Sequence, residues 1–164
     1  MTTLELLEYI AAERAALAGC YPLPSPLDCV RYALTELGEY EDAMLRAERT
    51  GDKRNNQKPS DARRELGQVG EMLGAAANQL RWIDFVSSDI TERDAERFDW
   101  IADILSALVI AYEYRCMSNH SAYKVHMAFL YWVCLVKWHG WDPNSLLVER
   151  YAQVREKHCT EVQP

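Results

Sequence analysis

Apolar side chains recur every three or four residues along most of this chain, and this spacing places them on one face of an α-helix. The clearest series run through residues 27–44, 66–83, 98–112 and 147–154. Only 7 Gly and 6 Pro occur among the 164 residues, so few breaks interrupt these helices. No strand pattern of alternating apolar and polar residues competes. The sequence therefore predicts an all-α bundle of about five to six helices.

The chain length suits one domain that buries its own core. Capping patterns mark two helix starts, at Thr2 with Glu5 and at Asp142 followed by Pro143. Within a single domain over residues 1–164, we expect an extra N-terminal helix in residues 1–19, a pair of long helices in residues 27–87, and the remaining bundle helices in residues 91–158.

Charge and hydropathy limit the partners of the chain. A formal net charge of -7 disfavours a nucleic-acid backbone as the main partner. The most apolar run, MAFLYWVCLV, is shorter than the roughly 20 residues that span a bilayer, so we expect no membrane partner. The start of the chain lacks the basic and apolar regions of a secretory signal, and the 5 cysteines include no Cys-x-x-Cys pair. We therefore expect a cytoplasmic protein with reduced cysteines.

Two stretches, TELGEYEDAM and RRELGQVGEML, repeat Glu-Leu-Gly with a polar side chain three residues after the glutamate. The first stretch supplies Glu36 and Glu39, and the second supplies Glu65 and Gln68. Side chains three residues apart share a helix face, so packing the two helices along their apolar stripes would bring both polar edges together. Three carboxylates and an amide oxygen would then form an oxygen-only site, which suits Mg²⁺ or Mn²⁺.

At these residues the sequence resembles the MazG-like, all-α nucleoside triphosphate pyrophosphohydrolases. The signature of that family is Glu-Glu-x-x-Glu on one helix and Glu-x-x-Asp on the next. Here Thr35 stands at the leading glutamate and Gln68 at the aspartate. The resemblance covers residues 27–80, is weaker over residues 139–158, and is absent from the first helix.

The resemblance implies hydrolysis of a nucleoside or deoxynucleoside triphosphate to the monophosphate and pyrophosphate. It implies that Glu36, Glu39 and Glu65 are catalytic residues that hold Mg²⁺, with Mn²⁺ as an alternative. It also implies a MazG-like bundle that assembles as a homodimer or homotetramer.

Basic side chains gather in and beside the loop between the two motif halves, among them Arg54, Lys58 and Arg64. Next to a metal site they would clamp a triphosphate, since an arginine can bind two phosphate oxygens at once. In the family the closing helix carries a lysine that helps to bind the nucleotide, and Arg150 falls at the corresponding place. The alternative is a solvated loop whose charges offset nearby acidic residues.

Gln68 offers a neutral oxygen where the family has a charged one, which weakens the attraction for a divalent ion. Another carboxylate would be needed to restore the charge, and the candidates are Asp61, Glu71, Asp99 and Asp103. Asp103 stands among apolar residues, where an acid is costly without a partner, so it is either a metal ligand or half of a buried pair.

Two other functions fit the same residues. The chain would be a catalytically degenerate relative if Gln68 abolishes activity, and would then bind a nucleotide or a protein partner. It would be an acidic helical interaction protein without a ligand if Glu36 and Glu39 only make a helix face soluble.

Overall fold

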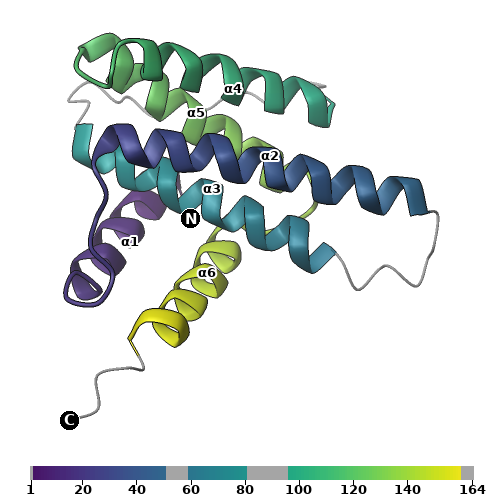
Figure 1. The fold of residues 1–164 in the computed structure, drawn as a ribbon, viewed down its shortest axis with the longest axis horizontal. Coiled ribbons are helices and arrows are strands. Elements are labelled where there is room, and N and C mark those ends of the chain that lie inside the picture. Colours follow the sequence, from purple (N-terminus) through teal and green to yellow (C-terminus); the bar gives the residue numbers. More distant parts are fainter. Residues whose placement is uncertain (1, 51–58, 81–95, 160–164) are drawn as a thin grey trace.

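The computed structural model describes residues 2–50, 59–80 and 96–159, and these residues form six α-helices and no strand (Figure 1). The helices are α1 (Thr3–Ala16), α2 (Pro26–Thr50), α3 (Pro59–Leu80), α4 (Arg97–Glu113), α5 (Asn119–Trp138) and α6 (Pro143–His158). The predicted all-α fold is confirmed. The predicted extension of the second long helix to residue 87 lies outside the described residues.

Helix α3 is the central element of the fold. It runs alongside α2, to which it is joined in sequence, and also packs against α1, α5 and α6. Helices α4 and α5 form a second pair on one side of α3, and α1 and α6 lie on its other side (Figure 1). One hydrophobic core contains residues from all six helices. No helix in the described part of the chain is long and apolar enough to cross a membrane.

A glycine lets α5 approach α3 closely. A Cβ atom at Gly70 would lie 2.2 Å from Cζ2 of Trp132, so no larger residue fits there without moving the tryptophan. Trp132 is fully buried, and its Nε1 donates a hydrogen bond of 2.7 Å to the carbonyl oxygen of Leu66. This contact holds α5 close against the Leu66–Gly70 part of α3.

Both predicted helix starts are confirmed. Thr2 and Glu5 form a reciprocal capping box before α1. The Asp142 carboxylate accepts a hydrogen bond of 2.9 Å from the backbone N–H of Ser145 before α6. These local signals were readable from the sequence because a capping interaction spans only three residues.

The prediction of reduced cysteines is wrong for one pair. Cys20 and Cys159 form a disulfide, with Cα atoms 5.5 Å apart, whereas Cys29, Cys116 and Cys134 are free. The bonded cysteines follow α1 and α6, two helices that pack against each other. The two cysteines are 139 residues apart in sequence, so no local pattern indicated that they pair.

Candidate metal centre

Three glutamates converge where α2 lies beside α3. Glu36 and Glu39 belong to α2 and Glu65 belongs to α3, and one carboxylate oxygen from each lies within 4.8 Å of the other two. Glu65 is buried, Glu36 is half-buried and Glu39 is exposed, so the group is open to solvent on one side. In the described residues, no other three side chains of His, Cys, Asp or Glu converge in this way. The predicted meeting of the two motif halves is therefore observed.

Gln68 joins this group, but with its nitrogen rather than its oxygen. Its Nε2 donates a hydrogen bond of 2.8 Å to Oε2 of Glu36 and a second hydrogen bond to Oε2 of Glu65. The expected oxygen ligand is thus not what faces the carboxylates. The reason is chemical, because carboxylates only accept hydrogen bonds and the amide NH₂ is the donor that Gln68 can offer them. Its oxygen would face the site only after the amide rotates.

Glu36 retains its proton at unusually high pH. Burial, a hydrogen bond with Glu65, and the negative charges of Glu65 and Glu39 raise the pKa of Glu36 to about 7. Burial is the largest of these causes, and the neighbouring acidic side chains add to it. Crowding of this kind is relieved by a proton or by a cation.

We expect a pH-dependent difference in stability between the metal-free wild type and the Glu36→Gln variant. With a folded-state pKa near 7 against an ordinary 4.5, the folded wild type holds more protons than the unfolded chain between these values. The protonated Glu36 therefore stabilises the folded wild type below pH 4.5, and this stabilisation is lost as the pH rises toward 7. The Glu36→Gln variant has no proton to lose at this position, so the stability of the wild type relative to the variant falls over the same range. Urea denaturation from pH 4 to 8 with a chelator measures the difference.

The comparison with Glu36→Gln also removes the contribution of His139. Burial and the charge of Arg97 lower the pKa of His139 to about 4, so this residue favours folding more as the pH rises. Its effect is shared by both proteins and cancels in the difference. Parallel stability curves for the two proteins across the whole range would contradict the raised pKa of Glu36.

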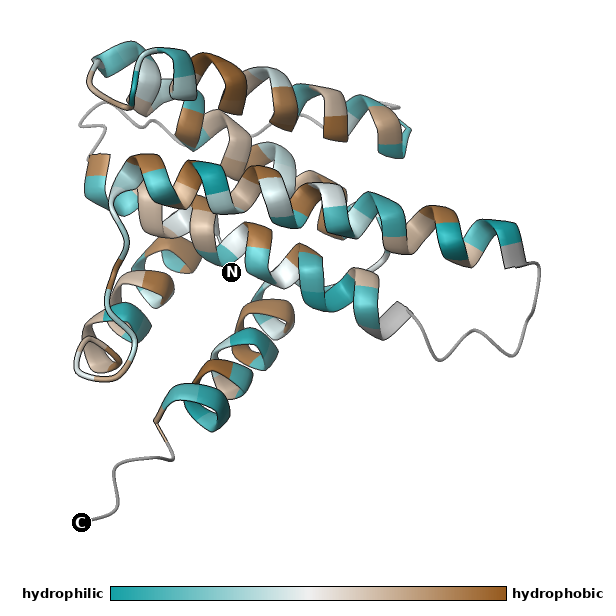
Figure 2. Cartoon of the chain, in the orientation of Figure 1, coloured by the Kyte–Doolittle hydropathy of each residue, from teal (hydrophilic) through white to brown (hydrophobic). Residues whose placement is uncertain are grey.

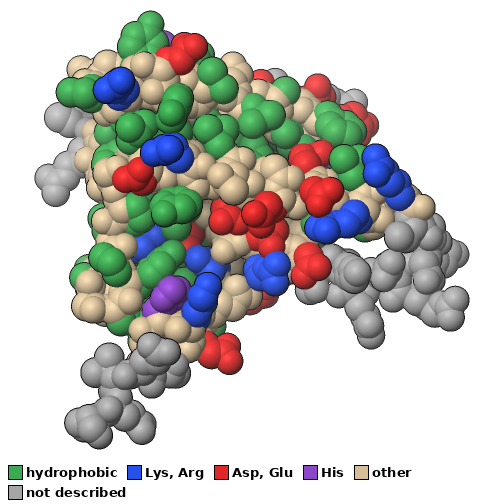
Figure 3. All heavy atoms as spheres, in the orientation of Figure 1, with side chains coloured by type: hydrophobic (Ala, Val, Ile, Leu, Met, Phe, Trp, Pro, Cys, Tyr) green, Lys and Arg blue, Asp and Glu red, His purple; other side chains and the backbone are tan. Residues whose placement is uncertain are grey.

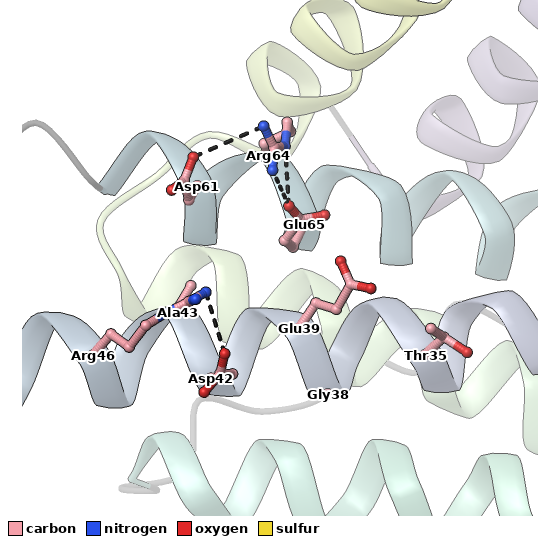
Figure 4. Close-up of a pocket in the computed structure, with 9 residues that line it drawn as sticks. All are labelled: Thr35, Gly38, Glu39, Asp42, Ala43, Arg46, Asp61, Arg64 and Glu65. Carbon is pink, nitrogen blue, oxygen red and sulfur yellow. Dashed lines mark hydrogen bonds and ion pairs between the residues drawn. The ribbon is translucent and has the colours of Figure 1, made fainter.

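A pocket of about 420 Å³ opens beside the three glutamates, between α2 and α3 (Figure 4). Figure 4 shows Glu39 pointing from α2 toward α3, where Arg64 and Glu65 form the opposite wall. The lining residues are Thr35, Gly38, Glu39, Asp42, Ala43, Arg46, Asp61, Arg64 and Glu65. The pocket therefore holds acidic side chains together with two arginines.

Arg64 is the predicted phosphate-binding residue that the structure places at this pocket. Its Nε donates a hydrogen bond of 3.0 Å to Oε1 of Glu65, and its Nη1 lies 3.8 Å from Oδ1 of Asp61. About half of the Arg64 side chain is exposed, so the guanidinium reaches solvent. Asp61, proposed as an additional carboxylate, also lies at the pocket but pairs with Arg64.

Arg46, one of the basic residues near the connecting segment that could bind a triphosphate, also lines the pocket. Its Nη2 lies 3.2 Å from Oδ2 of Asp42 in an exposed ion pair. The sequence signal for Asp42 and Arg46 is their spacing from Glu39. Positions 39, 42 and 46 recur every three or four residues and so share the face of α2 that meets the pocket.

Arg150 has a different place from the one predicted. It does not line the pocket, because its Nε lies 2.6 Å from Oε2 of Glu71 and its Nη2 donates a hydrogen bond of 3.3 Å to the hydroxyl of Tyr21. Glu71 is fully buried, and its Oε1 also lies 2.7 Å from Nη2 of Arg14. Glu71 therefore lies outside the acidic group and forms a charged cluster with Arg14 and Arg150 between α1, α3 and α6. The positive charge of Arg150 still acts on Glu36, where it partly offsets the rise in pKa.

The remaining predicted site residues do not join the acidic group. Asp103 and Asp99 lie on α4, and the structure does not bring either of them into the three-glutamate group. Asp99 instead accepts a hydrogen bond of 2.9 Å from the backbone N–H of Glu96 at the start of α4. Arg54 and Lys58 lie outside the described residues.

No protein-family model, no curated protein and no solved structure matches this chain. The resemblance to the MazG-like family therefore depends on the two motif stretches alone. Beside them, the structure shows that the described residues form six helices and that the two motif stretches meet between α2 and α3.

Proposed function

We propose that this chain is a Mg²⁺-dependent nucleoside triphosphate pyrophosphohydrolase of the MazG-like type, which releases a nucleoside or deoxynucleoside monophosphate and pyrophosphate. The convergence of Glu36, Glu39 and Glu65 within 4.8 Å, from two helices that carry matching motif halves, supports this proposal most strongly. Mn²⁺ is the alternative cofactor, because it accepts the same oxygen ligands. Nucleotides occur in the cytoplasm, so a cytoplasmic location remains part of this proposal, although the Cys20–Cys159 disulfide is of a kind that is rare in reducing compartments.

The donor set fits a hard divalent cation. All three side chains offer carboxylate oxygens, and Mg²⁺ is commonly held by a few carboxylates while phosphate oxygens complete its coordination. Burial first, and then the neighbouring carboxylates, raise the pKa of Glu36, and a bound cation would offset both effects. When bound, the metal neutralises phosphate charge and makes water a better nucleophile.

The other pocket residues have roles that follow from their positions. Arg64 has an exposed guanidinium at the pocket wall and would bind phosphate oxygens in a bidentate manner. Arg46 would contact the same phosphates from the α2 side. Asp61 lines the pocket with a carboxylate that could accept a proton from the attacking water. Arg54 and Lys58, which lie outside the described residues, remain predicted phosphate ligands.

A catalytically degenerate relative that binds a nucleotide or a protein partner is the second candidate. The observation that favours it is the hydrogen bonding of Gln68, whose amide nitrogen ties Glu36 to Glu65. A donor at this place satisfies the two carboxylates without an ion and competes with metal binding. For the chain to act as the proposed enzyme, a cation must bind Glu36 and Glu65 in place of the Gln68 amide nitrogen.

The test is release of monophosphate and pyrophosphate from each common NTP and dNTP, with Mg²⁺ or Mn²⁺. We expect Glu36→Ala and Glu65→Ala each to lower the rate about a hundredfold or more, since even residues that only support metal ligands contribute about 10- to 100-fold. Glu149→Ala is the matched control, because Glu149 is an exposed glutamate that pairs with Arg63 away from the pocket. Equal activity in all four proteins would exclude the proposed site.

Two further results separate the alternatives if the folded wild type is inactive. A rise in melting temperature with Mg²⁺ or Mn²⁺ that Glu65→Ala abolishes would support the degenerate relative, and activity gained by Gln68→Asp would identify the degenerate position. The absence of any shift with either ion would indicate a solvated acidic face without a ligand.

A further inference from the structure

A second cavity lies between α1 and α3, and it shares no lining residue with the pocket at the three glutamates. We call it the α1 cavity. Its volume is about 540 Å³, within the roughly 300–1,000 Å³ that is usual for small-molecule sites. Figure 2 shows hydrophobic residues along α1 and in the segment that joins it to α2. Most of the lining is apolar and includes Ile10, Ala11, Ala15, Ala18, Leu23 and Ala75.

Arg14 is the charged residue of this lining. Its side chain is only 4% exposed, and its Nη2 lies 2.7 Å from Oε1 of Glu71. Its Nε and Nη1 are buried and make no hydrogen bond to any described residue. The ring of Tyr21, whose centroid lies 4.4 Å from Cζ of Arg14, is a neutral neighbour. Buried donors without partners are costly, and an anion would satisfy them.

The charged cluster around Arg14 has more positive than negative charge. Arg14 and Arg150 share the single carboxylate of Glu71, so one positive charge has no counterpart within the cluster. Figure 3 shows further Lys and Arg side chains grouped on the part of the surface where α1 and α6 lie in Figure 1. This region is locally positive although the whole chain carries a net charge of -7, and local charge decides where a small anion binds.

The other polar side chains of the lining already have partners. The amide nitrogen of Asn78 donates a hydrogen bond of 2.9 Å to the carbonyl oxygen of Leu7, and that of Gln79 donates one of 3.0 Å to the carbonyl oxygen of Pro24. Arg14 is thus the lining residue that offers both charge and unused donors to a ligand.

We propose that the α1 cavity binds a small apolar carboxylate. The carboxylate group pairs with Arg14 at the inner end of the cavity, and the hydrocarbon part lies against the apolar side chains along α1. This combination matches the cavity in both of its properties, which are a buried surplus of positive charge and a mostly apolar wall. The site is separate from the acidic group and does not depend on the activity proposed for that group.

The dimensions of the cavity indicate the size of the ligand. Between Ile10 and Ala18 the lining follows α1 and its end over about 12 Å. An extended acid such as octanoate or decanoate matches this length. Ala15 and Ala18 are exposed, so the cavity opens to solvent beside them. Burial of the hydrocarbon chain supplies affinity, whereas pairing with Arg14 selects an acid over a neutral molecule of the same shape.

The experiment is isothermal titration calorimetry of the full chain with octanoate, decanoate and the neutral analogue 1-octanol. The wild type is expected to bind octanoate about tenfold or more tightly than 1-octanol, which is the effect of one hydrogen bond between charged groups. Decanoate is expected to bind more tightly than octanoate because it buries more hydrocarbon. Arg14→Met is expected to lose the preference for the acid and to retain binding of 1-octanol.

Filling the cavity tests its location. Ala15→Phe places a ring in the α1 cavity and is expected to weaken octanoate binding about tenfold or more, because the ring takes the space of the hydrocarbon chain. Ala12→Phe is the matched control, since Ala12 is also an exposed alanine of α1 but does not line the cavity. This control is expected to bind octanoate as the wild type does. Ala18→Phe is a second filled variant.

Far-UV circular dichroism and melting temperature show which variants are folded. Equal affinity of the wild type for octanoate and 1-octanol would overturn the proposal, because Arg14 would then contribute nothing. So would the absence of octanoate binding at millimolar concentrations. A folded Ala15→Phe or Ala18→Phe that binds octanoate as tightly as Ala12→Phe would also overturn it, because the acid would then bind elsewhere on the chain.

Discussion

Replacing Glu71 with glutamine is expected to lower the free energy of unfolding by about 3–5 kcal/mol, the usual cost of breaking a buried ion pair. The Glu71 side chain is 0% exposed and pairs with two guanidinium groups, at 2.7 Å from Arg14 and 2.6 Å from Arg150. Glutamine keeps the shape of the side chain but removes the only negative charge of this cluster. The buried guanidinium of Arg14 and the mostly buried guanidinium of Arg150, whose side chain is 14% exposed, then face each other between α1, α3 and α6. Urea denaturation at neutral pH measures the loss.

Two comparisons separate this effect from the loss of any carboxylate. Glu149→Gln makes the same change in the exposed pair with Arg63, where the Glu149 side chain is 52% exposed, and it should cost about 0–1 kcal/mol. Arg14→Met removes one positive charge and leaves Arg150 paired with Glu71, so its cost should fall below that of Glu71→Gln. A Glu71→Gln variant as stable as Glu149→Gln would contradict the buried cluster.

This cluster also shows why the sequence did not reveal the partner of Arg150. The position of Arg150 in the last helix suggested a role at the nucleotide, but its partner, Glu71, lies 79 residues away in sequence. One local signal was present, because Arg14 continues the apolar stripe of the first helix, and a buried arginine requires a buried acid. The identity of that acid depends on how three helices pack, which local periodicity does not determine.

The meeting of Glu36, Glu39 and Glu65 was predictable for the opposite reason. Each motif half is local to one helix, and the two helices follow each other in the chain with matching apolar stripes. Neighbouring antiparallel helices with short connections pack side by side, so the polar edges next to the stripes meet. The orientation of Gln68 was not predictable, because an amide presents its oxygen or its nitrogen according to the charges around it.

Reducing the disulfide between Cys20 and Cys159 is expected to lower the free energy of unfolding by about 2–5 kcal/mol. The bond closes nearly the whole chain into one loop, with a separation of 139 residues, and a long closed loop restricts the unfolded chain strongly. It also secures the end of α6 beside the segment after α1, where the rings of Tyr21 and His158 stack 4.9 Å apart. Urea denaturation with and without a reducing agent measures the effect.

Thiol counting and a serine variant distinguish the bond from other effects of the reductant. The oxidised, unfolded protein should show only the three thiols of Cys29, Cys116 and Cys134, and two more should appear after reduction. Cys20→Ser should match the reduced wild type in stability and should not respond to the reducing agent. Five thiols in the protein purified without reductant would contradict the bond. Equal stability of Cys20→Ser and the oxidised wild type would show instead that packing alone holds the ends of α1 and α6 together.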